Sequence, residues 1–204
     1  MVSTAHDAGD RAKQERRRQI LAAAKAVFVD AGYHGASIHA IIERAQIARG
    51  TFYLYFESKA AVFDSILDEA MRELRGRIHR IDVETPDAQP PQQQLRDQVF
   101  GTLDYILRDR ALATLLLSAG HTPDAEAAER LDQFFAEVHG LLERAMESGM
   151  EIGLLRKVHP QLAAAAMLGM FRGVVEQLIR EPELPPTETV VAEVLMVALR
   201  GVLK

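Results

Sequence analysis

Apolar residues recur every three to four positions along most of the 204-residue chain, which is the period of an amphipathic α-helix. No segment shows the sustained alternation of apolar and polar residues that is typical of a half-buried strand. The pattern therefore predicts an all-α fold, in which the proline-rich polar stretch at residues 82–94 is a loop. The predicted helices cover residues 12–31, 38–45, 48–56, 59–80, 95–109, 110–119, 123–149, 160–180 and 188–203.

The ends of the first helices are marked by residues that stop or cap helices. Gly32 is expected to end the first helix, and Ser37 and Ser58 are expected N-caps of the second and fourth. A short helix, a three-residue turn and a second short helix, following a longer first helix, have the spacing of a helix-turn-helix. We therefore divide the chain into a helix-turn-helix domain at residues 12–57 and a helical body at residues 58–204.

Four of the twelve aromatic residues of the chain lie within five positions of the stretch IARGTFYLYFESK, residues 47–59. On a helical wheel Phe52 and Phe56 share one face and are predicted to pack inward, whereas Tyr53 and Tyr55 are peripheral and Leu54 points outward. The alternative, in which all four rings are core, leaves the tyrosine hydroxyls and the flanking cations unexplained.

The charge is distributed unevenly along the chain. The net charge of −5 argues against nucleic-acid binding, but residues 11–59 hold nine Lys or Arg against four acidic residues. Residues 60–204 hold fifteen Lys or Arg against twenty-three acidic residues. A basic first quarter on an acidic remainder is typical of a small polyanion-binding domain attached to another body.

Several classes of function lack support in the residues. There is no cysteine, and the histidines of the body (79, 121, 139 and 159) lack the spacing of metal ligands on one helix. No nucleophile elbow or glycine-rich phosphate loop is present, so we expect no enzyme activity, metal or cofactor. The N-terminus lacks a secretory signal, and the longest nonpolar run, residues 162–171, is too short to span a bilayer. We expect a cytoplasmic protein without a membrane segment.

The last two predicted helices have no consistently polar face. A helix that is apolar all round must be buried all round, and a terminal helix pair has few partners within its own chain. Small residues such as Ala163, Ala166, Gly169 and Gly173 would let another helix approach closely. We therefore expect a homodimer through residues 160–180 and 188–203, the alternative being that these helices fill the centre of a monomer.

Residues 20–67 resemble the N-terminal domain of the tetracycline-repressor (TetR) family. The resemblance rests on the pattern A-x-x-x-F-x-x-x-G-Y, which begins at Ala24, and on G-T-x-Y-x-x-F-x-x-K, which begins at Gly50. The chain departs from the family where Gln46 replaces a glycine of the turn that often takes a left-handed conformation, and where Ile42 replaces a small alanine. Both departures predict a slightly different angle between the two short helices.

The resemblance implies that the second short helix enters the major groove of operator DNA, with Lys59 holding a phosphate group. We expect the basic arm before the domain to touch phosphate or the minor groove through Arg17, although Arg16, Arg17 and Arg18 would also suit a solvated helix start. Leu54 can offer only apolar contact, as with a thymine methyl group. The expected DNA-binding residues are Arg17, Ser37, His39, Arg49, Gly50, Thr51, Tyr53, Leu54, Tyr55 and Lys59.

For the body the resemblance implies only an architecture, a helical domain that binds a small inducer and dimerises through its last two helices. Large or polar side chains on the middle helices are candidates for the pocket, although each would also suit ordinary core packing. The candidates are Phe100, Tyr105, Leu116, His121, Phe135, His139, Met167, Met170 and Phe171.

The sequence therefore favours a dimeric, ligand-responsive transcriptional repressor that binds palindromic DNA and is released by a small-molecule inducer. Two alternatives remain open. One is a helical enzyme or small-molecule carrier with an incidental basic end. The other is a transcriptional activator or a nucleoid-type DNA-binding protein.

Overall fold

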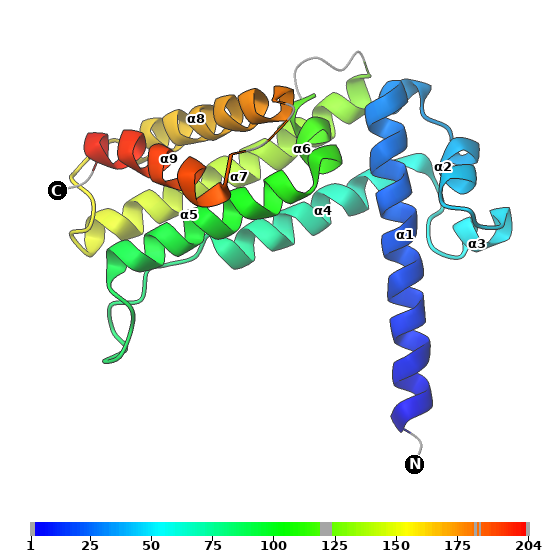
Figure 1. The fold of residues 1–204 in the computed structure, drawn as a ribbon, viewed down its shortest axis with the longest axis horizontal. Helices are drawn as coiled ribbons and strands as arrows, with labels where there is room; N and C mark the ends of the chain where they lie inside the picture. Colours follow the sequence, from blue (N-terminus) through cyan, green and yellow to red (C-terminus); the bar gives the residue numbers. More distant parts are fainter. Residues whose placement is uncertain (1–2, 119–123, 182, 184, 203–204) are drawn as a thin grey trace. The chain divides into compact units, whose positions relative to one another are not determined.

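Nine helices account for most of the chain in a computed structural model that describes residues 3–118, 124–181, 183 and 185–202 (Figure 1). These residues contain no strand, which confirms the predicted all-α fold. The helices are α1 Ser3–Gly35, α2 Ile38–Arg44, α3 Arg49–Tyr53, α4 Lys59–Arg77, α5 Pro91–Arg108, α6 Arg110–Leu117, α7 Ala125–Glu151, α8 Pro160–Arg180 and α9 Thr187–Val202.

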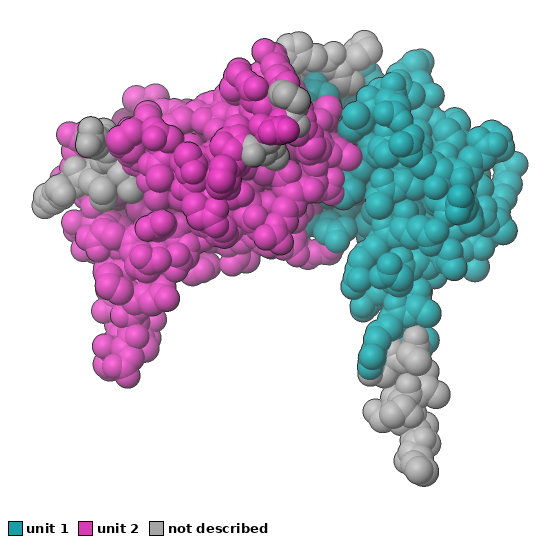
Figure 2. Space-filling model, in the orientation of Figure 1, with its two compact units in different colours: residues 1–69, 118–130 teal, residues 70–117, 131–204 magenta. Residues whose placement is uncertain are grey.

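The chain forms two compact units, which Figure 2 shows in different colours. Unit 1 comprises Met1–Glu69 and Ser118–Arg130, and unit 2 comprises Ala70–Leu117 and Leu131–Lys204. Helices α4 and α7 each contribute residues to both units. Unit 1 therefore extends beyond residues 12–57, and the functional boundary after residue 57 stays a prediction.

The core of unit 1 is built around aromatic rings. The rings of Phe28, Tyr33 and Phe63 lie 5.0–5.6 Å apart, so α1 and α4 are joined by one aromatic cluster. Ile41 of α2 and Phe52 of α3 are fully buried, which packs both short helices into the same unit. In Figure 1, α2 and α3 lie along the C-terminal half of α1.

The predicted caps are present. The Ser37 hydroxyl accepts a hydrogen bond from the Ala40 amide at 3.1 Å, and the Ser58 hydroxyl accepts one from the Ala61 amide at 3.0 Å. Gly32 has a φ of 67° and interrupts the helical path near the end of α1, as expected of a glycine stop.

Several predicted helix ends were wrong. Helix α1 begins at Ser3 rather than residue 12, and α4 ends at Arg77 rather than near residue 80. Helix α3 ends at Tyr53 instead of residue 56, because the chain must leave the helical path before Ser58 caps α4. Helix α5 begins at Pro91, inside the predicted loop, because proline is well tolerated in the first turn, where its missing N–H costs no helical hydrogen bond.

One buried cluster of unit 2 is formed by four helices, and its buried members are all aliphatic. It joins one face of α5 to α6, α8 and α9. This packing holds the last two helices against the centre of the unit on one side only. Its buried members are Val99, Leu103, Leu107, Ala113, Val175, Leu178, Val190, Val191 and Val194.

Tyr33 gives unit 1 a measurable pH dependence. Burial and the negative charges of Glu126, Asp124 and Asp64 raise the pKa of its hydroxyl to about 12, and the side chain is only 7% exposed. Between pH 10 and the folded-state pKa of about 12, the unfolded chain releases this proton while the folded chain keeps it. The free energy of unfolding should therefore fall in this window, by up to roughly 2 kcal/mol.

Tyr33→Phe should remove this dependence. Urea unfolding at pH 9 and pH 11.5 should show a larger loss of stability in the wild type than in Tyr33→Phe. Parallel losses in the two proteins would contradict the assignment.

Candidate nucleic-acid interface and ligand cavity

The aromatic cluster of α3 divides into an inner and an outer set. Phe52 is 0% and Phe56 is 4% exposed, whereas Tyr53 is 46% and Leu54 is 80% exposed. Tyr55 is half-buried. The prediction that only the phenylalanines are core is confirmed, and the alternative with four core rings is wrong.

The turn between α2 and α3 has a left-handed residue at the position where the family resemblance implies one. Gln46 has a φ of 51°, the only positive φ at a non-glycine position in the described residues. The side-chain amide of Gln19 on α1 donates a 2.7 Å hydrogen bond to the carbonyl of Ala45, which fixes the turn to its supporting helix. Ile42 is half-buried, and its effect on the angle between the helices stays a prediction.

Two arginines of unit 1 lie against the aromatic rings. The Arg17 guanidinium is 4.8 Å from the centre of the Phe56 ring, and that of Arg49 is 5.8 Å from the centre of the Tyr53 ring. Arg16 and Arg18 instead pair with Gln19 and Glu15 on their own helix. Arg17 is therefore the member of the basic run that packs onto the helix-turn-helix.

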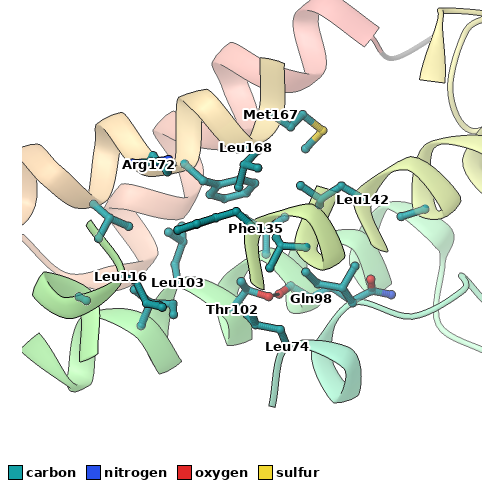
Figure 3. A pocket seen from close by; sticks show the side chains of 18 of the residues that line it. Leu74, Gln98, Thr102, Leu103, Leu116, Phe135, Leu142, Met167, Leu168 and Arg172 are labelled. Carbon is teal, nitrogen blue, oxygen red and sulfur yellow. Dashed lines mark hydrogen bonds between the residues drawn. The ribbon is translucent and has the colours of Figure 1, made fainter. Parts of the chain in front are cut away.

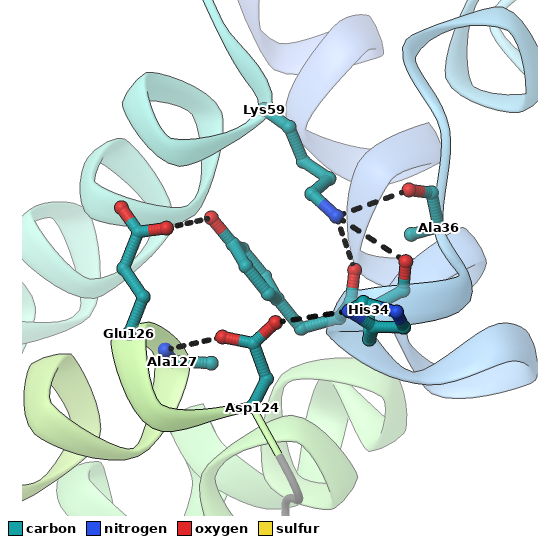
Figure 4. Close-up of polar contacts among 7 residues, drawn as sticks. His34, Ala36, Lys59, Asp124, Glu126 and Ala127 are labelled. Atoms are coloured by element: carbon teal, nitrogen blue, oxygen red, sulfur yellow. Dashed lines mark hydrogen bonds and ion pairs between the residues drawn. The ribbon is translucent and has the colours of Figure 1, made fainter.

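Lys59 has a structural partner that the sequence reasoning missed. Its ammonium group donates hydrogen bonds to the carbonyls of Tyr33 at 2.6 Å and Ala36 at 3.2 Å, and lies 4.3 Å from the centre of the Tyr33 ring (Figure 4). Carbonyls at the end of a helix lack helical donors, so a cation beside them is favourable. The sequence did contain a signal for this contact. Gly32 is the expected stop of α1, and Lys59 is the first residue of the next long helix, α4.

The remaining predicted DNA-binding residues lie at the surface of unit 1 or near it. Ser37 is occupied as a cap, and His39 Nε2 lies 3.4 Å from a Glu43 carboxylate oxygen on the same helix. Gly50 is exposed, and a Cβ atom there would meet nothing within 4 Å, so a backbone or a phosphate group could approach closely. Thr51 beside it is half-buried. The DNA-binding role of the whole set stays a prediction.

A polar cluster links α1, α4 and the first turns of α7 inside unit 1 (Figure 4). The Tyr33 hydroxyl lies 3.5 Å from a Glu126 oxygen, and His34 Nδ1 lies 3.5 Å from an Asp124 oxygen. Asp124 caps α7 by accepting a 3.1 Å hydrogen bond from the Ala127 amide, and this bond, helped by His34, lowers the pKa of the Asp124 carboxyl. Arg130 and Asp64 add an ion pair at 3.1 Å. An N-cap aspartate at residue 124 was the one sequence signal for this cluster.

Unit 2 encloses an apolar cavity between α4, α5, α6, α7 and α8 (Figure 3). Its empty volume is about 1010 Å³, a figure that includes solvent space at the open mouth. Polar side chains enter it only from Gln98, Thr102 and Arg172 among its described lining residues. The Arg172 guanidinium lies 4.7 Å from the centre of the Phe135 ring.

The cavity brings together some of the predicted pocket residues and not others. Leu116, Phe135, Met167 and Phe171 line it. His121 lies outside the described residues. Ligand binding by any of them stays a prediction.

The other candidates have different neighbours. Phe100 packs against the aliphatic core, and the Tyr105 ring lies 4.6 Å from the Arg77 guanidinium. His139 Nε2 lies 3.1 Å from the carbonyl of Gln161. Met170 lines a groove on the other side of α8, which it shares with α9. The sequence prediction therefore missed Gln98, Thr102 and Arg172, and its preference for large and polar side chains missed most of the aliphatic lining.

Helices α8 and α9 expose apolar side chains that a single chain does not cover. Leu162 is 68%, Met196 is 43% and Val197 is 66% exposed. The shallow groove between the two helices is also lined mainly by apolar residues. Helix α8 is long and apolar enough to cross a membrane by length and composition alone, which is weak support for a span because the helices of soluble proteins pass the same test.

No group of three or more His, Cys, Asp or Glu side chains in the described part of the chain could hold a metal ion. Unit 1 has a surface with exposed cations and aromatic rings, and unit 2 has an apolar cavity.

Comparisons with known proteins match both parts of the chain. Residues 20–66 match a family model described as bacterial regulatory proteins of the tetR family, and residues 88–176 match a tetracyclin repressor-like C-terminal domain. The structure is similar to that of SmeT solved with triclosan, with a TM-score of 0.72, 25% identity and coverage of 93% of this chain and 92% of that chain. SmeT is the repressor of the Stenotrophomonas maltophilia multidrug efflux pump SmeDEF.

Curated relatives include repressors and an activator. The transcriptional repressor KstR of Mycolicibacterium smegmatis is 31% identical over 153 residues, 72% of this chain and 71% of that protein. KstR of Mycobacterium tuberculosis is 31% identical over 142 residues, 69% of this chain and 63% of that protein, so the match spans less than two thirds of its length. The transcriptional activator FasR of M. smegmatis is 28% identical over 159 residues, 76% of this chain and 70% of that protein.

Gln46→Gly should stabilise unit 1. The left-handed conformation costs a non-glycine residue roughly 1 kcal/mol, which glycine avoids, although glycine also makes the unfolded chain more flexible. We expect a net gain of about 0.5 kcal/mol in the free energy of unfolding, measured by urea denaturation. The matched control Gln93→Gly, in helical conformation in α5, should lose roughly 1 kcal/mol. A loss at both positions would contradict the expected strain at Gln46.

Proposed function

This chain belongs to the tetracycline-repressor (TetR) family of bacterial regulatory proteins, and from that premise we propose that it is a ligand-responsive transcriptional repressor. It binds palindromic operator DNA as a homodimer in the cytoplasm and leaves the DNA when a small-molecule inducer occupies the body cavity. The observation that carries the proposal is the division of α3, where Phe52 is buried while Tyr53 and Leu54 are exposed beside Arg49.

The proposed DNA contacts follow from this exposure. Arg49 and Tyr53 reach the major groove from the start and the end of α3, and the exposed Leu54 offers apolar contact to a thymine methyl group. The open space in front of Gly50 lets the DNA backbone come close. Arg17, placed against Phe56, holds a phosphate group beside the domain.

The exposed apolar surface of α8 and α9 supports the proposed dimer. A monomer would leave Leu162, Met196 and Val197 in water, which is unfavourable for side chains clustered on adjacent helices. The exposed small residues Gly169 and Gly173 allow the backbone of a partner helix to approach. A two-fold dimer would also present two copies of α3 to a palindrome.

Helices α4 and α7 supply a route for coupling between ligand and DNA. Helix α7 contributes Phe134 and Phe135 to the cavity and Glu126 to the contacts at the end of α1. Helix α4 contributes Leu74 to the cavity and Lys59 to the carbonyls at the end of α1. In this proposal the two helices have two alternative positions, and an inducer acts by binding the protein more tightly in one of them than in the other.

A transcriptional activator is the second candidate, because FasR, an activator, is among the relatives. Both candidates require specific DNA binding and differ only in the effect on transcription. A carrier or enzyme with an incidental basic end would bind no DNA specifically. A titration of DNA binding therefore separates a carrier or enzyme from a repressor or an activator.

A gel shift with the intergenic DNA upstream of the gene tests the proposed function. We expect a specific complex that survives excess unrelated DNA and weakens steeply as salt rises, because phosphate contacts release counterions. Arg49→Ala should weaken the complex by about ten-fold or more. The control Arg156→Ala removes the same charge from an exposed position of unit 2 and should leave affinity within about two-fold. Absence of a specific complex at both of two salt concentrations would refute the proposal.

The proposed dimer is tested with Val197→Glu. An unpaired carboxylate in an apolar interface is strongly unfavourable, so light scattering after size exclusion should show a monomer at micromolar concentration. Val83→Glu is a matched control, because Val83 is also exposed, at 48%, but lies in the loop before α5. Val83→Glu should stay dimeric, and a dimeric Val197→Glu would refute the interface.

A further inference from the structure

We propose that the cavity of unit 2 takes up an uncharged, largely apolar ligand and discriminates against acids and amines of the same shape. This inference rests on the proposed function, since it names the chemical class of the inducer. It starts from the wall of the cavity. The surface that the described lining residues expose there is almost entirely carbon, although three of these residues have polar side chains.

The apolar wall decides what the bulk of the ligand is. Leucine, isoleucine, valine, alanine, methionine and phenylalanine side chains form most of it. Such a wall gains free energy in proportion to the apolar area of the ligand that it covers. It cannot replace the water that a charged group loses on entering, so a charged group needs a partner inside the cavity. The ligand class therefore depends on what Gln98, Thr102 and Arg172 can still offer.

The two polar residues of α5 already interact within the protein. The Thr102 hydroxyl donates a 2.8 Å hydrogen bond to the backbone carbonyl of Gln98, so its oxygen can only accept a further bond. The Gln98 side chain lies 3.4 Å from the backbone nitrogen of His79 through Oε1 and 3.4 Å from the ring Nδ1 of His79 through Nε2. Figure 3 shows Gln98 and Thr102 next to each other. What they leave is an acceptor, which suits a hydroxyl group of a ligand and not a carboxylate.

The cation of the wall is also engaged by the protein. The Arg172 guanidinium lies 4.7 Å from the centre of the Phe135 ring and has a further interaction within the chain. An acidic group on a ligand would have to compete with these contacts. An ammonium group would meet the like charge of Arg172, and no Asp or Glu among the described lining residues could balance it. Both ions therefore lose their water without gaining an uncommitted partner.

The expected order of affinity follows for ligands of equal size. A neutral alcohol loses little hydration and keeps all of its apolar contact, whereas the matching acid and amine each pay for the loss of a charged group's water. The order also separates two modes of binding. A ligand that left its head group in the water at the open mouth would bind equally well as an acid or as an alcohol.

The test uses the full chain and three probes on one scaffold, biphenyl-4-methanol, biphenyl-4-carboxylate and biphenyl-4-methylamine. At pH 7.4 the first is neutral, the second is an anion and the third is a cation. Isothermal titration calorimetry should give the alcohol an affinity at least about ten-fold above that of either ion.

A variant that fills the cavity shows where the alcohol binds. Ala145 of α7 lines the cavity and is half-buried, so Ala145→Leu should place three more carbon atoms there and weaken binding of the alcohol by about five-fold or more. Both residues are good helix formers, so α7 should be kept. The matched control Ala136→Leu, at an exposed position of the same helix, should leave the affinity within about two-fold.

Circular dichroism establishes whether each variant is folded, and Ala145→Met, whose flexible side chain adapts more easily, replaces Ala145→Leu if the latter does not fold. The inference is overturned if either ion binds as tightly as the alcohol, if filling the cavity leaves the affinity for the alcohol unchanged, or if none of the probes binds. Operator binding is measured separately on the protein without probe. Its absence would refute the proposed function, whereas its presence with a failed probe order refutes only the ligand class.

Discussion

Burial of the Phe52 ring determines which side chains of α3 can reach another molecule. A helix of five residues is too short to be stable by its own hydrogen bonds, so its orientation depends on packing. Phe52 is the wholly buried side chain of α3, and Phe56 follows it inward one turn later. Successive positions on a helix point about 100° apart. The same contact that buries Phe52 therefore forces Tyr53 and Leu54 outward, and the exposed surface is a consequence of the core.

Several residues that carry the family resemblance pack together or form hydrogen bonds at the end of α1. Gly32 takes the positive φ that lets the chain turn, and the Tyr33 ring then packs between Phe28 and Phe63. Lys59 satisfies the carbonyls that this turn leaves without helical donors. The motif that begins at Ala24 and the motif that begins at Gly50 therefore meet at the end of α1. Their joint occurrence in the sequence reflects this shared contact. A phosphate group would compete with these carbonyls for the same ammonium group.

The sequence predicted the helices and the face of α3 well, because both depend on periodicity and on turn residues with specific conformations. Gln46 was singled out by the family resemblance, which implies a turn position that is often left-handed, and its φ of 51° agrees. The cavity was harder to predict. Periodicity separates inner from outer residues, but it does not separate an inner residue that touches a neighbour from one that borders empty space. Leu116 and Phe100 both occupy apolar positions in the helical period of the sequence. Only Leu116 lines the cavity, whereas Phe100 packs against the aliphatic cluster.

The contacts near the end of α1 suit a protein whose DNA-binding unit must be released by a ligand. His34 and Asp124 form a pair in which His34 is largely exposed, and the Tyr33–Glu126 distance of 3.5 Å is long for a hydrogen bond. Burial raises the pKa of the Asp64 carboxyl despite the neighbouring Arg130, so that pair gains little net stability. By contrast, an apolar ligand that fills the cavity gains about 25 cal/mol for each Å² that it covers. In the proposed coupling, a fraction of that free energy would be enough to shift α7 and break these weak contacts, so the proposal assigns control of the coupling to the cavity.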